Sequence, residues 1–150
     1  MNVETFLAHA IQLEREAARR YEELAAGMGS DGHAELKAFF TRMARYSRLH
    51  LADAMARGGF RDVPVIAPTD FEWPDGVSPE VADWAGVDAF LDARGALEVA
   101  MDCERRGHAW YAAMAASHHD PEVQALAREF ADEEADHLRQ LEQLLQAHPA

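Results

Sequence analysis

Apolar residues recur along this chain at alternating three- and four-residue steps in four long segments, a period typical of helices with one buried face. The first segment runs from about Asn2 to Ala26, where glycines interrupt it. The second follows Asp31, which can cap a helix N-terminus, and ends near Arg57 before two adjacent glycines. The pattern predicts two helices joined by a short loop.

A second pair of helices is expected in the C-terminal half. The third helix should begin between Asp88 and Asp92 and continue to about Ser117. An Asp-Pro-Glu sequence at 120–122 then supplies an N-cap, a proline at the first helical position and an acidic first turn for the fourth helix.

Between about residues 58 and 87 the helical pattern breaks, and four prolines and two tryptophans occupy the segment. It is too long and too aromatic for a tight turn, so we interpret it as a crossover along the bundle, with a short helical turn at 78–80. A connection of this length lets the flanking helices run parallel. The predicted fold class is all-α, an up-down four-helix bundle with a long crossover between helices 2 and 3, formed by residues 1–150 as a single domain.

Charge and composition narrow the possible partners. The formal net charge of −13 disfavours nucleic acid, because phosphate backbones are also negative. No run approaches the roughly 20 apolar residues that a membrane-spanning helix needs, and the N-terminus lacks the features of a signal peptide. One cysteine, Cys103, cannot build a disulfide framework. We therefore expect a cytoplasmic protein with no nucleic-acid or membrane partner.

Metal-competent side chains interrupt the apolar helix faces at five positions, which are Glu14, His50, Glu104, Glu134 and His137. An unpaired carboxylate buried among apolar residues costs several kcal/mol, so it would normally be neutralised or replaced. A bound cation removes that cost, because several carboxylates can share one strong positive charge. The pattern therefore indicates a metal site at one level of the bundle.

The two halves of the chain resemble a diverged internal repeat. Glu14 precedes Tyr21 by seven residues, and Glu104 precedes Tyr111 by the same interval. The histidines of the two halves follow these glutamates by 36 and 33 residues. We expect both tyrosines to be packing residues whose hydroxyl groups bond to a ligand carboxylate.

The sharpest local element is the pair Glu134 and His137, three residues apart in the last helix. Residues at this spacing stand one above the other, so a carboxylate oxygen and an imidazole nitrogen can reach the same ion. Nitrogen and oxygen ligands with open coordination positions suit iron or manganese better than a closed structural zinc site. The residues flanking this motif, Glu133 and Asp136, are expected to be solvated.

Across nearly the whole chain, these residues resemble the rubrerythrin branch of the ferritin-like superfamily, with matching positions at Glu14, His50, Glu104, Glu134, His137, Tyr21 and Tyr111. The resemblance implies a di-iron protein that reduces hydrogen peroxide or uses dioxygen to oxidise ferrous iron, and that forms a homodimer or larger assembly. Many members carry a rubredoxin domain that supplies electrons. Cys103 alone cannot bind the iron of such a domain, so we expect none here, and the resemblance then implies a separate electron donor protein.

One position departs from the pattern. Ser47 lies three residues before His50, where the family places a bridging glutamate. A neutral hydroxyl cannot span two ions, so three outcomes are open: water or an anion fills the gap, another side chain substitutes, or only one metal binds. His108 is the candidate substitute, because it lies four residues after Glu104 on the same helix face.

Two functional hypotheses follow, from different classes. The first is a non-haem iron oxidoreductase, acting on peroxide or dioxygen with two iron ions, or with one ion or another divalent metal. The second is a degenerate ferritin-like protein with one metal or none, acting in iron binding or assembly, and Ser47 keeps it open. A bundle with no site is the third alternative, and it predicts that the carboxylates on the apolar helix faces are either neutralised or turned toward solvent.

Overall fold

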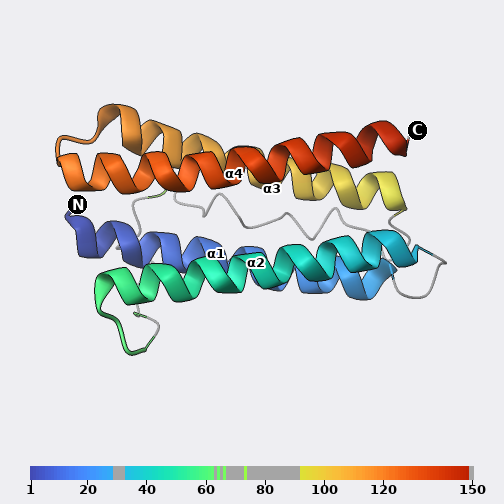
Figure 1. Ribbon diagram of the computed structural model, residues 1–150, viewed down its shortest axis with the longest axis horizontal. Coiled ribbons are helices and arrows are strands. Elements are labelled where there is room, and N and C mark those ends of the chain that lie inside the picture. The colour runs from blue at the N-terminus through green and yellow to red at the C-terminus, as the bar shows by residue number, and fades with distance from the viewer. Residues whose placement is uncertain (29–32, 63, 65, 67–72, 74–91, 149–150) are drawn as a thin grey trace.

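The structure, a computed structural model, describes residues 1–28, 33–62, 64, 66, 73 and 92–148. Its helices are α1 (Val3–Met28), α2 (Ala34–Gly58), α3 (Ala93–Ser117) and α4 (Pro121–Ala147), as Figure 1 shows. In that view α1 and α4 run in one direction, and α2 and α3 run in the other.

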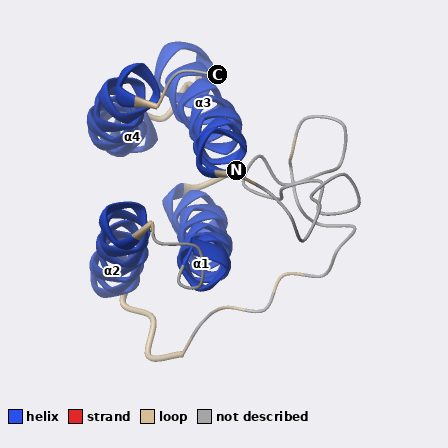
Figure 2. Ribbon diagram, turned by 90° about the vertical axis from the view of Figure 1, so that its right-hand side faces the viewer, coloured by secondary structure: helices blue, strands red, loops and turns tan. Residues whose placement is uncertain are grey.

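Seen along the bundle, the four helices occupy the corners of a square (Figure 2). The hairpin of α1 and α2 forms one layer, and the hairpin of α3 and α4 forms the other, so α3 lies over α1 and α4 lies over α2. This arrangement confirms the all-α, up-down four-helix bundle with a long connection between α2 and α3, and it confirms that these two helices are parallel. The helical turn expected at 78–80 lies outside the described residues.

Capping side chains begin the two C-terminal helices, and the cap at Asp120 was expected from the sequence. Asp92 accepts a hydrogen bond from the backbone N–H of Gly95 at 2.7 Å, and Asp120 accepts one from Glu122 at 2.9 Å. The described part of α3 begins at Ala93 with Asp92 as its N-cap, at the end of the window expected for its start, and most of the crossover expected at about 58–87 lies outside the described residues.

The α1–α2 turn differs in detail from the expectation. Helix α1 continues to Met28, two residues beyond Ala26. His33 occupies the N-cap position of α2 without a side-chain capping bond, and Asp31 lies outside the described residues. Gly59 ends α2 as expected, with a left-handed backbone at φ 70° that glycine adopts without steric cost.

Each helix passes from one apolar cluster to another, with polar side chains between them. One cluster is built on residues such as Tyr21, Leu24, Phe40, Leu97 and Leu141, and the other on residues such as Phe6, Ile11, Ala54, Tyr111 and Phe130. Six buried polar residues lie between these clusters in chain order, which are Glu14, Arg20, Ser47, Glu104, Glu134 and His137. The fold thus carries a polar layer at mid-length, closed at both ends by apolar packing.

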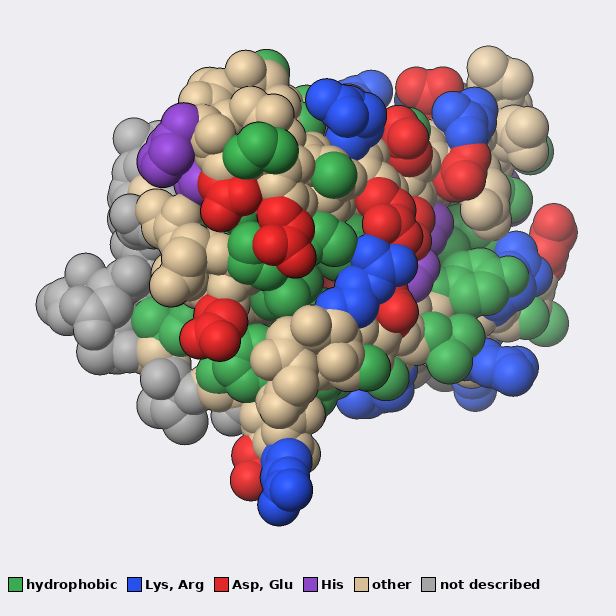
Figure 3. All heavy atoms as spheres, turned by 60° about the vertical axis from the view of Figure 1, so that its left-hand side comes forward, with side chains coloured by type: hydrophobic (Ala, Val, Ile, Leu, Met, Phe, Trp, Pro, Cys, Tyr) green, Lys and Arg blue, Asp and Glu red, His purple; other side chains and the backbone are tan. Residues whose placement is uncertain are grey.

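Charged side chains of both signs lie interspersed over the face drawn in Figure 3. Within the described parts of the chain, none of the helices has the length and apolar character to cross a membrane.

The two layers are joined at the surface by Arg57 of α2 and Glu129 of α4. Two parallel hydrogen bonds of 2.7 and 2.6 Å connect the guanidinium to the carboxylate, and this contact lowers the pKa of Glu129. We expect Glu129→Gln to reduce the free energy of unfolding by at most about 1 kcal/mol, since both side chains are solvent-exposed.

The sign of the pH dependence follows from the lowered pKa. The contribution of Glu129 is present above the ordinary glutamate pKa and is lost as the pH falls through the lower folded value. Chemical unfolding of the Glu129→Gln variant at neutral and acidic pH measures this contribution to the free energy of unfolding. Glu142→Gln on the same helix is the control. A loss of stability that is equal at both pH values would contradict this account.

Candidate metal centre

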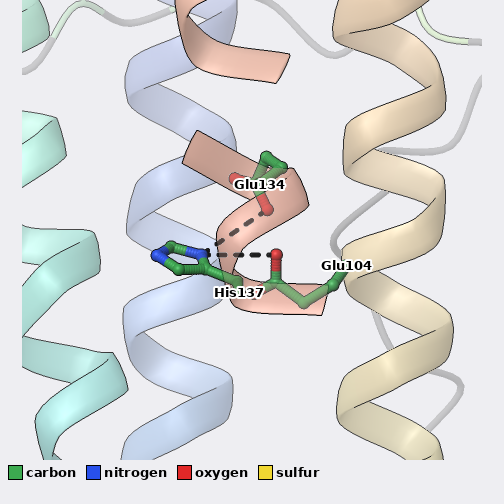
Figure 4. A group of neighbouring side chains, drawn as sticks. All are labelled: Glu104, Glu134 and His137. Atoms are coloured by element: carbon green, nitrogen blue, oxygen red, sulfur yellow. Dashed lines mark ion pairs between the residues drawn. The ribbon is translucent and has the colours of Figure 1, made fainter. Parts of the chain in front are cut away.

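Glu104 of α3 and Glu134 and His137 of α4 converge in the polar layer (Figure 4). Their exposed fractions are 1%, 4% and 5%, so all three are buried. His137 Nδ1 lies 3.6 Å from Glu104 Oε2 and 3.8 Å from Glu134 Oε2. One ligand atom from each residue lies within 4.8 Å of the others, a group that could hold a metal ion.

These separations fit a shared ion better than direct hydrogen bonds. Two ligand atoms about 2.1 Å from a common ion are about 3.0 to 3.6 Å apart when the angle at the ion is roughly 90 to 120°. The observed values of 3.6 and 3.8 Å lie at or just above that range and beyond a good hydrogen bond. Glu104 Oε2 and His137 Nδ1 are buried without a hydrogen-bond partner, which an ion would supply.

Two residues of α1 hold the other oxygen of Glu104. The Tyr21 hydroxyl donates to Glu104 Oε1 at 2.5 Å, and the Arg20 guanidinium lies 3.4 Å from the same oxygen. Burial raises the pKa of Glu104, but its polar contacts with Glu134 and His137 and the charges of His137 and Arg20 lower it further than burial raises it. Glu104 is therefore held as a carboxylate, and the expected bond from Tyr21 to a candidate ligand is present.

Helices α1 and α2 form a matching pair in the same layer. His50 Nδ1 lies 3.7 Å from Glu14 Oε1, nearly the separation of 3.6 Å between His137 and Glu104. The two imidazole rings stack on each other with centroids 5.6 Å apart and an interplanar angle of 11°. The internal repeat seen in the sequence therefore corresponds to two similar glutamate–histidine pairs, one in each helical hairpin. We call these pairs, with the residues around them, the two half-sites.

Glu133 is not simply solvated, as the sequence pattern suggested. Its side chain is half-buried, and Glu133 Oε2 lies 3.6 Å from His50 Nε2, so His50 has a carboxylate near each ring nitrogen. Burial and the charges of neighbouring carboxylates raise the pKa of Glu133, although the His50 charge opposes them. Burial lowers the pKa of His50, but the contacts with Glu14 and Glu133 raise it further, so the net shift is upward. Asp136 is exposed, as expected, and pairs with Arg139.

The remaining candidates occupy different surroundings. Ser47 is buried on α2, at 1% exposure, and Tyr111 lines a small hollow together with Glu14 and His50. His108 is half-buried. Among the described residues, Glu104, Glu134 and His137 form the one group of three or more potential ligands with atoms within 4.8 Å of one another. His108 is not part of this group. A ligand role for His108 and a carboxylate bond from Tyr111 stay predictions.

Sequence reasoning missed two charged residues of this layer. Arg20 belongs to a second buried stripe of α1, in which the neighbouring members are Leu13, Ala17 and Leu24. Glu133 follows Phe130 by three residues and precedes His137 by four, so it too lies at helical spacing from buried residues. Both signals were present in the pattern, but a charged side chain at the edge of an apolar face is most often solvated.

A four-helix bundle with buried carboxylates and a histidine at mid-length is consistent with a ferritin-like protein. The chain is similar to COG1633, an uncharacterized conserved protein from Magnetospirillum magnetotacticum MS-1 known from a crystal structure, with 34% sequence identity and a TM-score of 0.83. The match covers 100% of this chain and 97% of that one, so the chain belongs to the same family as that uncharacterized protein. No protein-family model and no curated protein matches the sequence.

The buried carboxylates give a direct test of the centre. We expect Glu134→Gln to abolish divalent-ion binding, while the metal-free protein changes in unfolding free energy by less than about 1 kcal/mol, because a neutral amide of similar shape relieves charge crowding beside Glu104. Thermal unfolding with and without Co²⁺ measures both effects. Asp132→Asn, at an exposed position two residues away, is the control and should keep the metal-induced rise in midpoint.

Proposed function

We propose that this protein is a ferritin-like iron protein of the rubrerythrin kind, in which ferrous iron bound by Glu104, Glu134 and His137 reacts with hydrogen peroxide or dioxygen. The observation that supports this most strongly is the buried convergence of two carboxylates and one imidazole, with ligand atoms within 4.8 Å of one another. Oxygen and nitrogen ligands of this kind favour iron or manganese. The buried Cys103 does not belong to this group, so no thiolate biases the site toward softer metals.

The residues of the chain prepare the site for this chemistry. Arg20 and Tyr21 keep Glu104 ionised and oriented through one oxygen, which leaves the other oxygen directed at His137. Tyr46 stacks on the His137 ring, with centroids 6.4 Å apart and an interplanar angle of 8°, and so restrains the imidazole plane. The apolar clusters on both sides limit the access of bulk water.

Bound ferrous iron would supply an electron and an open coordination position for the oxidant. Reduction of one peroxide molecule to water takes two electrons and two protons. One ferrous ion supplies only one of these electrons, so every turnover would need electrons from a separate electron donor protein, which we include in the proposal as a partner of this chain. A homodimer or larger assembly is part of the same proposal.

A second candidate function is iron binding without turnover. Ser47 favours it, because a buried neutral hydroxyl replaces the carboxylate that would complete the second half-site. The two functions differ in one measurable respect: both require bound iron, but only the first requires faster peroxide consumption.

The test loads metal-free protein with Fe²⁺ under anaerobic conditions and then adds hydrogen peroxide. We expect ferric absorbance to develop at least about tenfold faster than with free Fe²⁺, because the ligands stabilise the ferric product. Glu134→Gln should remove the acceleration, and the exposed-site variant Asp132→Asn should keep it. Iron that binds without acceleration would favour the second function, and a chain that binds no iron would exclude both.

A further inference from the structure

The two half-sites differ in how many carboxylates face a single imidazole nitrogen. His137 Nδ1 faces both Glu104 and Glu134, at 3.6 and 3.8 Å. Three ligand atoms from two helices are therefore directed at one point. This is the arrangement that a single divalent ion needs from the protein, with its other positions left open.

The carboxylates around His50 are divided between its two nitrogens. Nδ1 faces Glu14 at 3.7 Å, and Nε2 faces Glu133 at 3.6 Å. The lone pairs of the two ring nitrogens point away from each other, so one ion cannot use both. Ser47 stands three residues before His50, as Glu134 stands three before His137, and it provides no carboxylate for Nδ1.

Charge favours the same asymmetry. The ionisable side chains of the polar layer are the three buried carboxylates, the half-buried Glu133 and His50, the buried His137 and the guanidinium of Arg20, which is 2% exposed. Arginine stays protonated in proteins, so Arg20 places a permanent positive charge 3.4 Å from Glu104 Oε1. Glu104, Glu134 and Arg20 together carry a net charge of −1, so one divalent ion already more than balances it and a second would add uncompensated positive charge.

We infer that the centre holds one divalent cation per chain, at Glu104, Glu134 and His137, and that Arg20 serves as a fixed internal cation in place of a second metal ion. This inference rests on the proposed function, because it specifies the number of ions and the charge balance of the same site. Glu14 and His50 then form an ion-pair half-site that does not bind the ion directly.

The first experiment measures stoichiometry. Metal-free full-length chain is titrated with Co²⁺ and, anaerobically, with Fe²⁺, and bound metal is counted by mass spectrometry of the desalted protein. We expect one ion per chain. Two ions per chain would overturn this inference and leave the proposed function standing, whereas no bound ion would overturn both.

The matched glutamates test which half-site binds. Glu104→Gln should abolish binding, while Glu14→Gln, the equivalent change in the other hairpin, should keep one ion per chain with an affinity within about tenfold of the parent. A dinuclear centre would lose metal in both variants. Loss of the ion in Glu14→Gln, with the protein still folded by circular dichroism, would contradict the inference.

Arg20 variants test the internal cation. Arg20→Met should lower the thermal midpoint of the metal-free protein and raise affinity for Co²⁺ by about tenfold or more, because a repelling charge leaves the site. Arg20→Lys keeps the charge and should keep the affinity, and exposed Arg19→Met is the control. A purely structural arginine would give weaker metal binding in Arg20→Met, which is the outcome that refutes its role. If Arg20→Met does not fold, the glutamate pair decides the proposal.

Discussion

Buried negative charge is the constraint on which the rest of this structure depends. Glu14, Glu104 and Glu134 lie inside a bundle whose interior is otherwise mostly apolar. Carboxylates there are tolerated only with partners, and hydrogen bonds, the guanidinium of Arg20 and the imidazole of His137 supply part of what they need. Buried atoms of Glu104 and His137 without hydrogen-bond partners show that the protein groups do not satisfy the layer completely. A bound cation would supply the partner that these buried atoms lack.

The bundle places this layer where all four helices can contribute to it. Apolar clusters at both ends fix the rotation and register of each helix, so the polar positions meet at mid-length. The long connection lets α2 run parallel to α3. Within each hairpin the two helices are antiparallel, and each hairpin supplies one glutamate–histidine pair. The two pairs have nearly equal separations, so the two hairpins present their glutamate and histidine in a similar way.

The two hairpins nevertheless differ in the side chains that surround their histidines. Glu134 and Ser47 occupy equivalent positions, three residues before the two histidines. Glu133 of α4 faces the Nε2 atom of His50, whereas Glu14 faces its Nδ1 atom. Arg20 adds a charge to one carboxylate. One half-site therefore has converging ligand atoms and the other is an ion pair, and a few side chains account for this difference.

Sequence alone determined the helical segments, the cap at Asp120 and most of the polar positions that face inward, because helical period and capping chemistry are local properties. Tertiary structure decided which of these positions meet. Packing between helices that are far apart in sequence decides three features of the site. It buries Arg20, it sets which nitrogen of His50 faces Glu133, and it leaves His108 outside the closest ligand group. A one-dimensional pattern records which face a residue occupies, but not the rotamer or the neighbour across the bundle.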